Sequence, residues 1–438
     1  MRMWSWGLSI CVAGILLAGC GGRSTGPEGV TPPAGAPALL AATPGSKTTV
    51  AAPDFQALPG AKAYFGALGR SGYRIEMPSR WNGELLLWAH GVHGFGAEVF
   101  VENPPDGLRQ ALIDEGYAWA ASSYSENGYS AGLGANDTLT LKWYFAQRFG
   151  APKRTYIAGA SLGGHVVALS LENFPGEYNG GLAVCGAVAG EEQIDYWLAW
   201  AMAAEYFAGH QFPIGGSEAQ AADVLNASIL PALGPVDAPS EAGKAFESVI
   251  RNLTGGPRPF FEEGYRTAYP FNFGLLTGDP DRSIPMSAAA TNEGADYRAD
   301  ARFGFAADEL NRAIRRLAAD PELRDAVKHP DTAPTTGRIN IPLLTLHETG
   351  DLTVPVSAEQ SYRRKVEAAG AGGLLVQRLI RSGTHCAFSG EEVVQAWDDL
   401  AAWVRDGEKP AGEDVLGDLS DAGRAFTNPL RSGDPGGR

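Results

Sequence analysis

Basic clusters, internal repeats and cysteines are scarce or absent in this sequence. Its 438 residues include 35 Lys and Arg against 50 Asp and Glu, a formal net charge of −15, with no cluster of basic side chains of the kind that neutralises phosphates. Nucleic acid is therefore excluded as a partner. Only four cysteines occur, and two of them, Cys11 and Cys20, lie in an N-terminal leader. The hydrophobic content of 44% is enough for a large core in one domain or two.

The leader has the features of an export signal. Arg2 supplies a positive charge, residues 8–17 form an apolar stretch too short to span a membrane, and Leu17-Ala18-Gly19-Cys20 closes it with small residues. This segment resembles a bacterial lipoprotein signal, in which Cys20 becomes the acylated first residue. The alternative is an ordinary secretory signal cleaved nearby. Both predict an exported protein, either lipid-anchored in the cell envelope or secreted. The residue after Cys20 is not Asp, and the resemblance then implies the outer membrane in a Gram-negative host.

The remaining chain divides by composition and by the order of its predicted elements. After the signal (1–20), residues 21–53 contain mainly small residues and Pro and predict a flexible tether, and residues 406–438 predict a poorly ordered tail. Strands and helices alternate over 54–190 and 338–405, which predicts right-handed βαβ crossovers and a mostly parallel sheet flanked by helices. Residues 191–337 show helical patterns near 217–229, 241–253 and 303–327 and predict a helical cap inserted over the sheet.

A nucleophile motif lies at the centre of the first half. A β-prone run ends in Gly159-Ala160-Ser161-Leu162-Gly163, and an apolar, helix-compatible segment follows. Glycines two residues before and after the serine permit a tight strand-to-helix turn that exposes its hydroxyl at a helix N-terminus. The motif therefore predicts Ser161 as a catalytic nucleophile.

A glycine-rich loop follows the buried run 84–89. In this class of site, one oxyanion donor is the amide after the nucleophile, here Leu162, and the other comes from a loop such as this one. We place the second donor at Val92, with Gly91 as the alternative. A metal pair of His90 and His93 is a rival interpretation, which the lack of a further ligand at suitable spacing disfavours.

A serine hydroxyl needs an imidazole as base and a carboxylate to orient that imidazole. Asp351 and His385 each follow a predicted strand, and the chain order Ser161, Asp351, His385 is the one expected of α/β-hydrolases. Other acidic residues and histidines are less well placed for these roles. Glu348 lies too early in its loop, Asp331 precedes the strand, and His347 lies inside a strand end. His165 lies on a helix, His210 in the cap and His329 at the surface.

Several motifs together resemble those of the α/β-hydrolase superfamily, in particular secreted bacterial serine hydrolases with a large cap. The matching segments are Trp81 to Gly91, Gly159 to Gly163, Asp351 to Pro355 and Gly383 to Cys386. The resemblance implies an α/β-hydrolase fold and covers roughly residues 60–190 and 338–405. One departure is that Ala160 precedes Ser161, whereas tannase-type feruloyl esterases carry a cysteine beside the serine that is joined to one beside the histidine.

Cys185 and Cys386 follow two strands whose carboxyl ends are expected on the same side of the sheet. Outside the cytoplasm a disulfide between them is chemically permitted and would hold the loop that bears His385. Two buried free thiols are the alternative.

The sequence thus predicts a serine hydrolase that cleaves a carboxylic ester, small or polymeric, through an acyl-enzyme, without a metal or organic cofactor. Amide or peptide hydrolysis and acyl transfer use the same triad, and a non-catalytic envelope scaffold is the alternative from another class. The acyl and alcohol parts of the substrate depend on the cap, whose sequence is rich in aromatic residues but carries no recognisable motif. The oligomeric state has no sequence signal.

Overall fold

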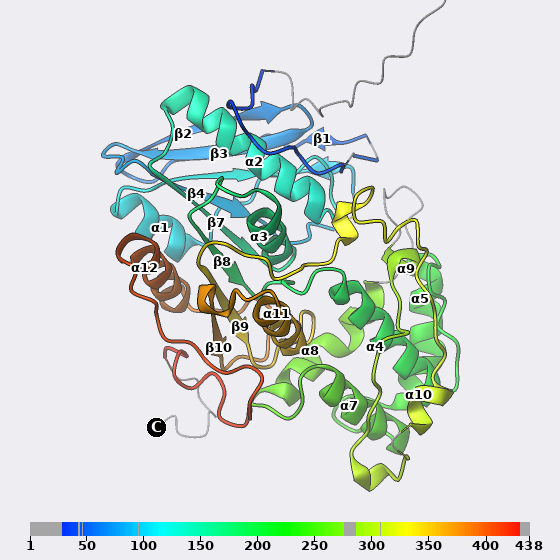
Figure 1. Ribbon diagram of the computed structural model, residues 1–438. Helices are drawn as coiled ribbons and strands as arrows, with labels where there is room; N and C mark the ends of the chain where they lie inside the picture. The colour runs from blue at the N-terminus through cyan, green and yellow to red at the C-terminus, as the bar shows by residue number, and fades with distance from the viewer. Residues whose placement is uncertain are drawn as a thin grey trace, which may run out of the picture.

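A single eight-stranded sheet forms the centre of the computed structural model (Figure 1). The structure describes residues 29–42, 44–45, 47–94, 96–275, 286–306 and 308–429. The strand order is β2-β3-β6-β4-β7-β8-β9-β10. The contacts of β3 with β2 and β6 are antiparallel, and all other pairs are parallel. The strands are β2 (Ala61–Leu68), β3 (Ser71–Pro78), β4 (Glu84–Ala89), β6 (Ala118–Ser122), β7 (Arg154–Ala160), β8 (Gly180–Val184), β9 (Leu343–Glu348) and β10 (Leu375–Ile380).

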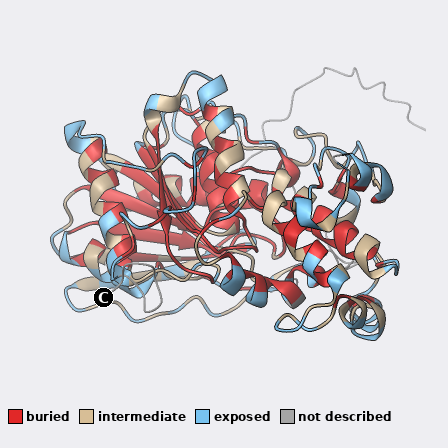
Figure 2. Ribbon diagram, turned by 90° about the horizontal axis from the view of Figure 1, so that it is seen from below, coloured by how far each residue is buried: buried red, intermediate tan, exposed pale blue. Residues whose placement is uncertain are grey.

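Helices cover both faces of this sheet, which is why its central strands are apolar without alternation. Successive side chains of β4 point to opposite faces: Leu85 and Leu87 pack with one set of helices, and Leu86 and Trp88 pack with the other. The first set is α2 (Ala131–Phe149), α3 (Leu162–Asn173) and α11 (Val356–Ala368), and the second is α1 (Asp106–Asp114) and α12 (Gly390–Asp406). The buried core follows the sheet across the molecule (Figure 2).

The segment between β8 and β9 forms the cap, and its helices gather to one side of the sheet (Figure 1). Trp200 of α4 is fully buried there against the rings of Phe246, Tyr265 and Phe273. The cap helices are α4 (Glu192–Ala208), α5 (Glu218–Val224), α6 (Leu230–Leu233), α7 (Glu241–Leu253), α8 (Phe261–Gly274), α9 (Met286–Ala289) and α10 (Glu309–Ala313), with a π-helical segment at Leu225–Ile229 and 3₁₀ turns at Ala301–Phe303 and Pro330–Thr332.

The helix expected over 303–327 is wrong for most of its length. Only Glu309–Ala313 is α-helical, because the following residues bind an earlier part of the cap. Arg316 donates to the carbonyls of Asn292 and Ala295, and the amide of Leu317 donates to the Asn292 side chain. These contacts hold the chain extended.

The predictions of a flexible tether at 21–53 and a poorly ordered tail at 406–438 are wrong for the residues of these segments that the structure describes. Leu40 exchanges two hydrogen bonds with the Asn136 side chain of α2, and β1 (Thr49–Val50) pairs with β5 (Glu98–Val99). Within 407–429, Val415 and Leu419 pack on Val356 and Leu379. A few apolar residues in each segment are thus enough to dock it on the core. The signal, Cys20 and residues 21–28 and 430–438 lie outside the described residues.

No helix in the described ranges is both long and apolar enough to cross a bilayer.

Candidate active site

The chain has the α/β-hydrolase fold, and the turn between β7 and α3 has the geometry of a nucleophile elbow. Ser161 has φ +57° and ψ −119°, a backbone conformation that is strained for a residue with a side chain. The neighbouring glycines are required by contact: a Cβ on Gly159 would lie 2.5 Å from the Gly163 carbonyl oxygen, and one on Gly163 would lie 2.0 Å from that of Ala89. The strand, turn and helix predicted around the serine are therefore confirmed.

The three predicted catalytic side chains meet at this turn. The Ser161 hydroxyl lies 2.9 Å from His385 Nε2, and His385 Nδ1 lies 2.5 Å from Asp351 Oδ2. Asp351 is fully buried, and its Oδ1 accepts from the amides of Thr353 (2.8 Å) and Val354 (3.1 Å). The carboxylate is thus fixed by its own loop and can only accept from His385 Nδ1–H, which leaves Nε2 as the acceptor for the serine proton.

The rival side chains contact neither Ser161 nor His385 and make other hydrogen bonds. Glu348 is buried and accepts from the Ala387 amide; burial and the nearby Asp351 raise its pKa well above the usual value. Asp331 accepts from the amides of residues 132 and 133 at the start of α2. His165 lies 3.2 Å from the Tyr129 hydroxyl, and burial lowers its pKa to about 3. His347 lies inside β9 and binds the Val354 carbonyl.

Val92 and Leu162 are predicted to supply the oxyanion donors. Val92 and Leu162 line the same cavity as Ser161. The loop that carries Val92 passes directly over the serine, since a Cβ on Gly91 would lie 3.2 Å from Ser161 Cβ.

The two histidines of this loop belong to a column of four stacked rings, which sequence reasoning missed. The rings follow the order Tyr124, His90, His93, Phe100, with centroids 3.8, 3.9 and 4.0 Å apart. His93 Nε2 lies 2.7 Å from Glu102 Oε2, and burial lowers the pKa of His90 to about 4. Stacked face to face, the pair supports the loop below Val92.

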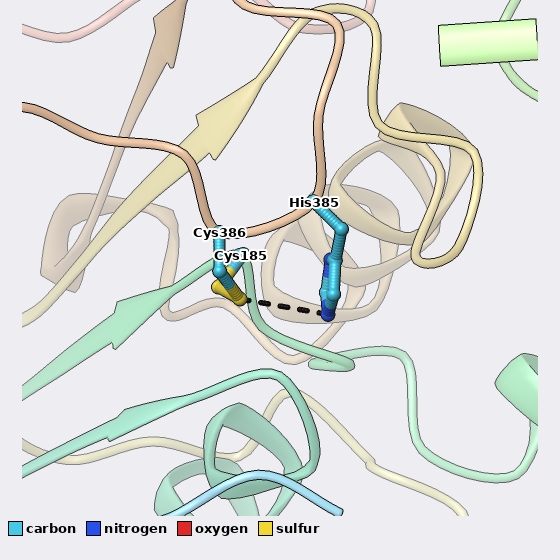
Figure 3. A group of neighbouring side chains, drawn as sticks. All are labelled: Cys185, His385 and Cys386. Carbon is cyan, nitrogen blue, oxygen red and sulfur yellow. Dashed lines mark hydrogen bonds between the residues drawn. A yellow bond between two sulfur atoms is a disulfide. The ribbon is translucent and has the colours of Figure 1, made fainter. Parts of the chain in front are cut away.

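Over the described ranges, one group of three His, Cys, Asp or Glu side chains has ligand atoms close enough for a metal ion, namely Cys185, His385 and Cys386. Cys185 and Cys386 are joined by a disulfide, which removes both thiolates as ligands (Figure 3). The predicted disulfide is confirmed. It ties the end of β8 to the loop of the candidate base, with Cys386 Sγ 3.5 Å from His385 Nε2.

The cap is hydrogen-bonded to the loop that carries Asp351, a feature with no sequence motif to reveal it. Two carbonyls of that loop, at Leu352 and Thr353, accept from cap side chains at 2.7 to 2.9 Å. The four donors come from α4 and α8: Gln193, Tyr196, Trp197 and Asn272. Gly264 of α8 also packs on Gly350, where an added Cβ would lie 1.6 Å from the carbonyl oxygen. Cap and triad loop therefore form one packed unit.

A cavity of about 480 Å³ opens at Ser161 between the sheet and the cap. Apart from His385, no ionisable Asp, Glu, Lys or Arg side chain appears among the described residues that line it. Phe271 of α8 lies at the cavity with its side chain 55% exposed. The other lining residues are Val92, Gly94, Tyr129, Leu162, Ala187, Gln193, Trp197, Gly274, Leu275, Thr353 and Val354.

No family model and no curated protein matches the sequence. Among solved structures, similar chains include an acylaminoacyl peptidase from Pyrococcus horikoshii (11% identity, 82% of this chain and 44% of that one, TM-score 0.41). Feruloyl esterase B from Aspergillus oryzae is 14% identical over 80% of this chain and 81% of that one, with a TM-score of 0.41. Est1E from Butyrivibrio proteoclasticus is 13% identical over 79% and 98%, with a TM-score of 0.38.

This chain spans less than half the length of the acylaminoacyl peptidase.

Proposed function

We propose that this protein is a serine hydrolase that cleaves a carboxylic ester through an acyl-enzyme. The observation that carries the proposal is the hydrogen-bonded chain from Asp351 through His385 to Ser161, which ends in an apolar cavity. A serine in a strained elbow, facing an imidazole that a buried carboxylate orients, has the arrangement needed for nucleophilic attack at neutral pH.

In the first half-reaction, Ser161 Oγ attacks the acyl carbon while its proton passes to His385 Nε2. The carbonyl oxygen becomes an oxyanion, which the amides of Leu162 and Val92 stabilise. His385 then donates the proton to the leaving alkoxide, and the C–O bond of the ester breaks. In the second half-reaction, His385 takes a proton from water as the resulting hydroxide attacks the acyl carbon. The bond between Ser161 Oγ and the acyl carbon then breaks, His385 returns the proton to Ser161 Oγ, and the carboxylic acid leaves. Asp351 stays ionised throughout and stabilises the imidazolium.

The lining of the cavity favours an uncharged substrate. A buried ammonium or carboxylate group without a partner costs several kcal/mol, and the described lining residues offer no charged side chain other than the candidate base. Trp197 and Tyr129 supply aromatic surface beside the nucleophile. Neutral esters with an apolar acyl or alcohol part satisfy these conditions better than peptides with a free amino terminus.

A fluorophosphonate probe tests the proposed chemistry, because it reacts with serines activated in this way. We expect labelling of the wild-type protein and none of Ser161→Ala. Absence of labelling in the wild type, or persistence in the variant, would overturn the proposal in favour of a non-catalytic role.

A panel of p-nitrophenyl esters of graded chain length, run beside peptide anilides, separates the two hydrolase classes. We expect turnover of the esters. Rapid anilide cleavage with inert esters would show a peptidase instead.

We also propose that Cys20 is acylated and anchors the enzyme in the cell envelope, at the outer membrane in a Gram-negative host. This rests on the leader sequence alone. Metabolic labelling with an alkyne fatty acid tests it: the wild type should incorporate the label and Cys20→Ala should not. Unlabelled, released wild-type protein would indicate an ordinary secretory signal.

A further inference from the structure

A second pair of buried ionisable side chains lies directly behind the candidate triad acid. His347 of β9 and Glu359 of α11 are both fully buried, and His347 Nδ1 lies 3.5 Å from Glu359 Oε1. On its other edge, His347 Nε2 donates to the Val354 carbonyl at 2.8 Å and lies 3.8 Å from Asp351 Oδ2. That oxygen is the one that accepts from His385. The two imidazoles therefore flank one carboxylate oxygen.

The contacts of this pair point to a charged state, in which His347 carries two protons and Glu359 none. A carbonyl can only accept, so the contact with Val354 requires a proton on His347 Nε2. Glu359 Oε2 accepts from Thr345 (2.6 Å) and Gln377 (2.5 Å), whereas Oε1 faces only His347. A neutral ring would set the lone pair of Nδ1 against that of a buried carboxylate oxygen. A second proton, on Nδ1, removes this clash and makes the 3.5 Å contact an ion pair between an imidazolium and a carboxylate, whereas a proton on Oε1 would leave both side chains neutral.

The surrounding charges agree with this assignment. Burial alone lowers the pKa of His347, but the hydrogen bond and charge of Glu359, followed by the charges of Asp351 and Glu348, outweigh burial and raise the pKa to about 9. Burial and the charge of Asp351 raise the pKa of Glu348 well above the usual value.

Other charged or titratable groups act on the same carboxylate, Asp351. They are His385 from the loop after β10, Arg258 from the cap and Tyr196 from α4. Burial lowers the pKa of Arg258 to about 10, which still leaves it cationic at pH 7, and burial keeps Tyr196 neutral.

We propose that His347 and Glu359 form a buried ion pair that positions Asp351 and sets the charge felt by the catalytic base. His347 and Glu359 contact neither substrate nor reacting atoms, so both are positioning residues. The inference rests on the proposed function. The His347 cation attracts the Asp351 carboxylate and repels the imidazolium of His385.

Removal of the cation should move the acidic limb of the rate profile. The two rings share Asp351 Oδ2 at 2.5 and 3.8 Å, so they lie within about 6 Å of one another, where unit charges shift each other's titration by about half a unit to two units. In His347→Gln the midpoint of kcat/KM against pH should rise by this amount. Glu359→Gln should give the same shift, since His347 loses its anion and becomes neutral. The double variant should shift no further than either single variant.

The experiment measures kcat/KM for a p-nitrophenyl ester from pH 5 to 9, with unfolding midpoints for each variant. Thr345→Val is the matched control, because it removes the hydrogen bond from Thr345 to the Glu359 carboxylate without changing a charge. A destabilised variant with an unmoved pH midpoint, or additive shifts in the double variant, would overturn the proposal.

A second measurement does not depend on activity. The chain has seven histidines, so carbon-13 labelling of the imidazoles gives a small set of signals, and the one lost in His347→Gln is assigned to His347. We expect it to report an imidazolium up to about pH 9 in the wild type and a neutral ring at pH 7 in Glu359→Gln. A neutral His347 at pH 7 in the wild type refutes the ion pair. Failure of the fluorophosphonate to label the protein would refute the proposed hydrolase and leave this result standing.

Discussion

Two neighbouring carboxyl groups, Asp351 and Glu348, should respond in opposite ways to replacement by the isosteric amide. In Asp351→Asn, the side-chain oxygen must stay on the amides of Thr353 and Val354, because an NH₂ group there would face two donors. The NH₂ group then points at His385 Nδ1 and forces the tautomer that carries its proton on Nε2, facing Ser161. The base is lost.

The magnitude follows from the tautomer. In a serine triad the acid-to-amide change lowers kcat about 10⁴-fold, or about 5.5 kcal/mol of transition-state stabilisation. Glu348→Gln is the control: burial and the charge of Asp351 raise the pKa of its carboxyl group well above the usual value, and the amide oxygen can still accept from Ala387. We expect its kcat to stay within about threefold of the wild type.

The assay is steady-state hydrolysis of a p-nitrophenyl ester at pH 7, with circular dichroism to check that each variant is folded. If Asp351→Asn kept more than about a tenth of wild-type kcat, the tautomer argument would be wrong. Equal losses of kcat in Asp351→Asn and Glu348→Gln would instead show that Glu348 also acts as an acid of the catalytic site.

Three further predictions concern stability. Replacing Cys185 and Cys386 together by alanine opens a loop of 201 residues and should lower the free energy of unfolding in urea by about 3 to 5 kcal/mol; a reduced wild type as stable as the oxidised one would contradict this. Gly264→Ala should lower the free energy of unfolding by about 1 to 3 kcal/mol through overpacking and should lower kcat by displacing the Gly350 loop. Gly294→Ala, whose added Cβ would meet nothing within 4 Å, should leave stability and kcat unchanged. The raised pKa of His347 contributes stability that is fully present below its ordinary value of 6.5 and is lost as pH rises through about 9; urea unfolding at both ends of this window should show the loss in the wild type and not in His347→Gln.

The elbow and the triad were predictable because their constraints are local. Gly159 and Gly163 restrict the backbone within a few residues of Ser161, and Asp351 and His385 each follow an apolar run that reads as a buried strand. Once the sheet is parallel, the ends of such strands meet at one edge. The fold and the meeting of the three side chains therefore follow from short segments taken in order.

Long-range contacts could not be predicted in this way. The docking of Leu40 on Asn136 depends on the surface of a helix about a hundred residues away, and composition alone suggested a tether. In the same way, Arg316 abolishes a helix by binding carbonyls more than twenty residues earlier. The sequence around His347 predicts a packed structural histidine and gives no sign of the ion pair, because its partner Glu359 lies on a helix whose register against β9 is set by the fold.

The hydrogen bonds between the cap and the Asp351 loop make the insertion an unsuitable unit for exchange. A foreign cap would arrive without Tyr196 and Asn272, and the Leu352 carbonyl would lose its donors. Chimeras that swap the insertion to change specificity should thus lose turnover before they gain a new substrate. Directed evolution of the proposed activity should instead begin with single substitutions at Phe271, whose exposed ring lies at the cavity and outside those bonds.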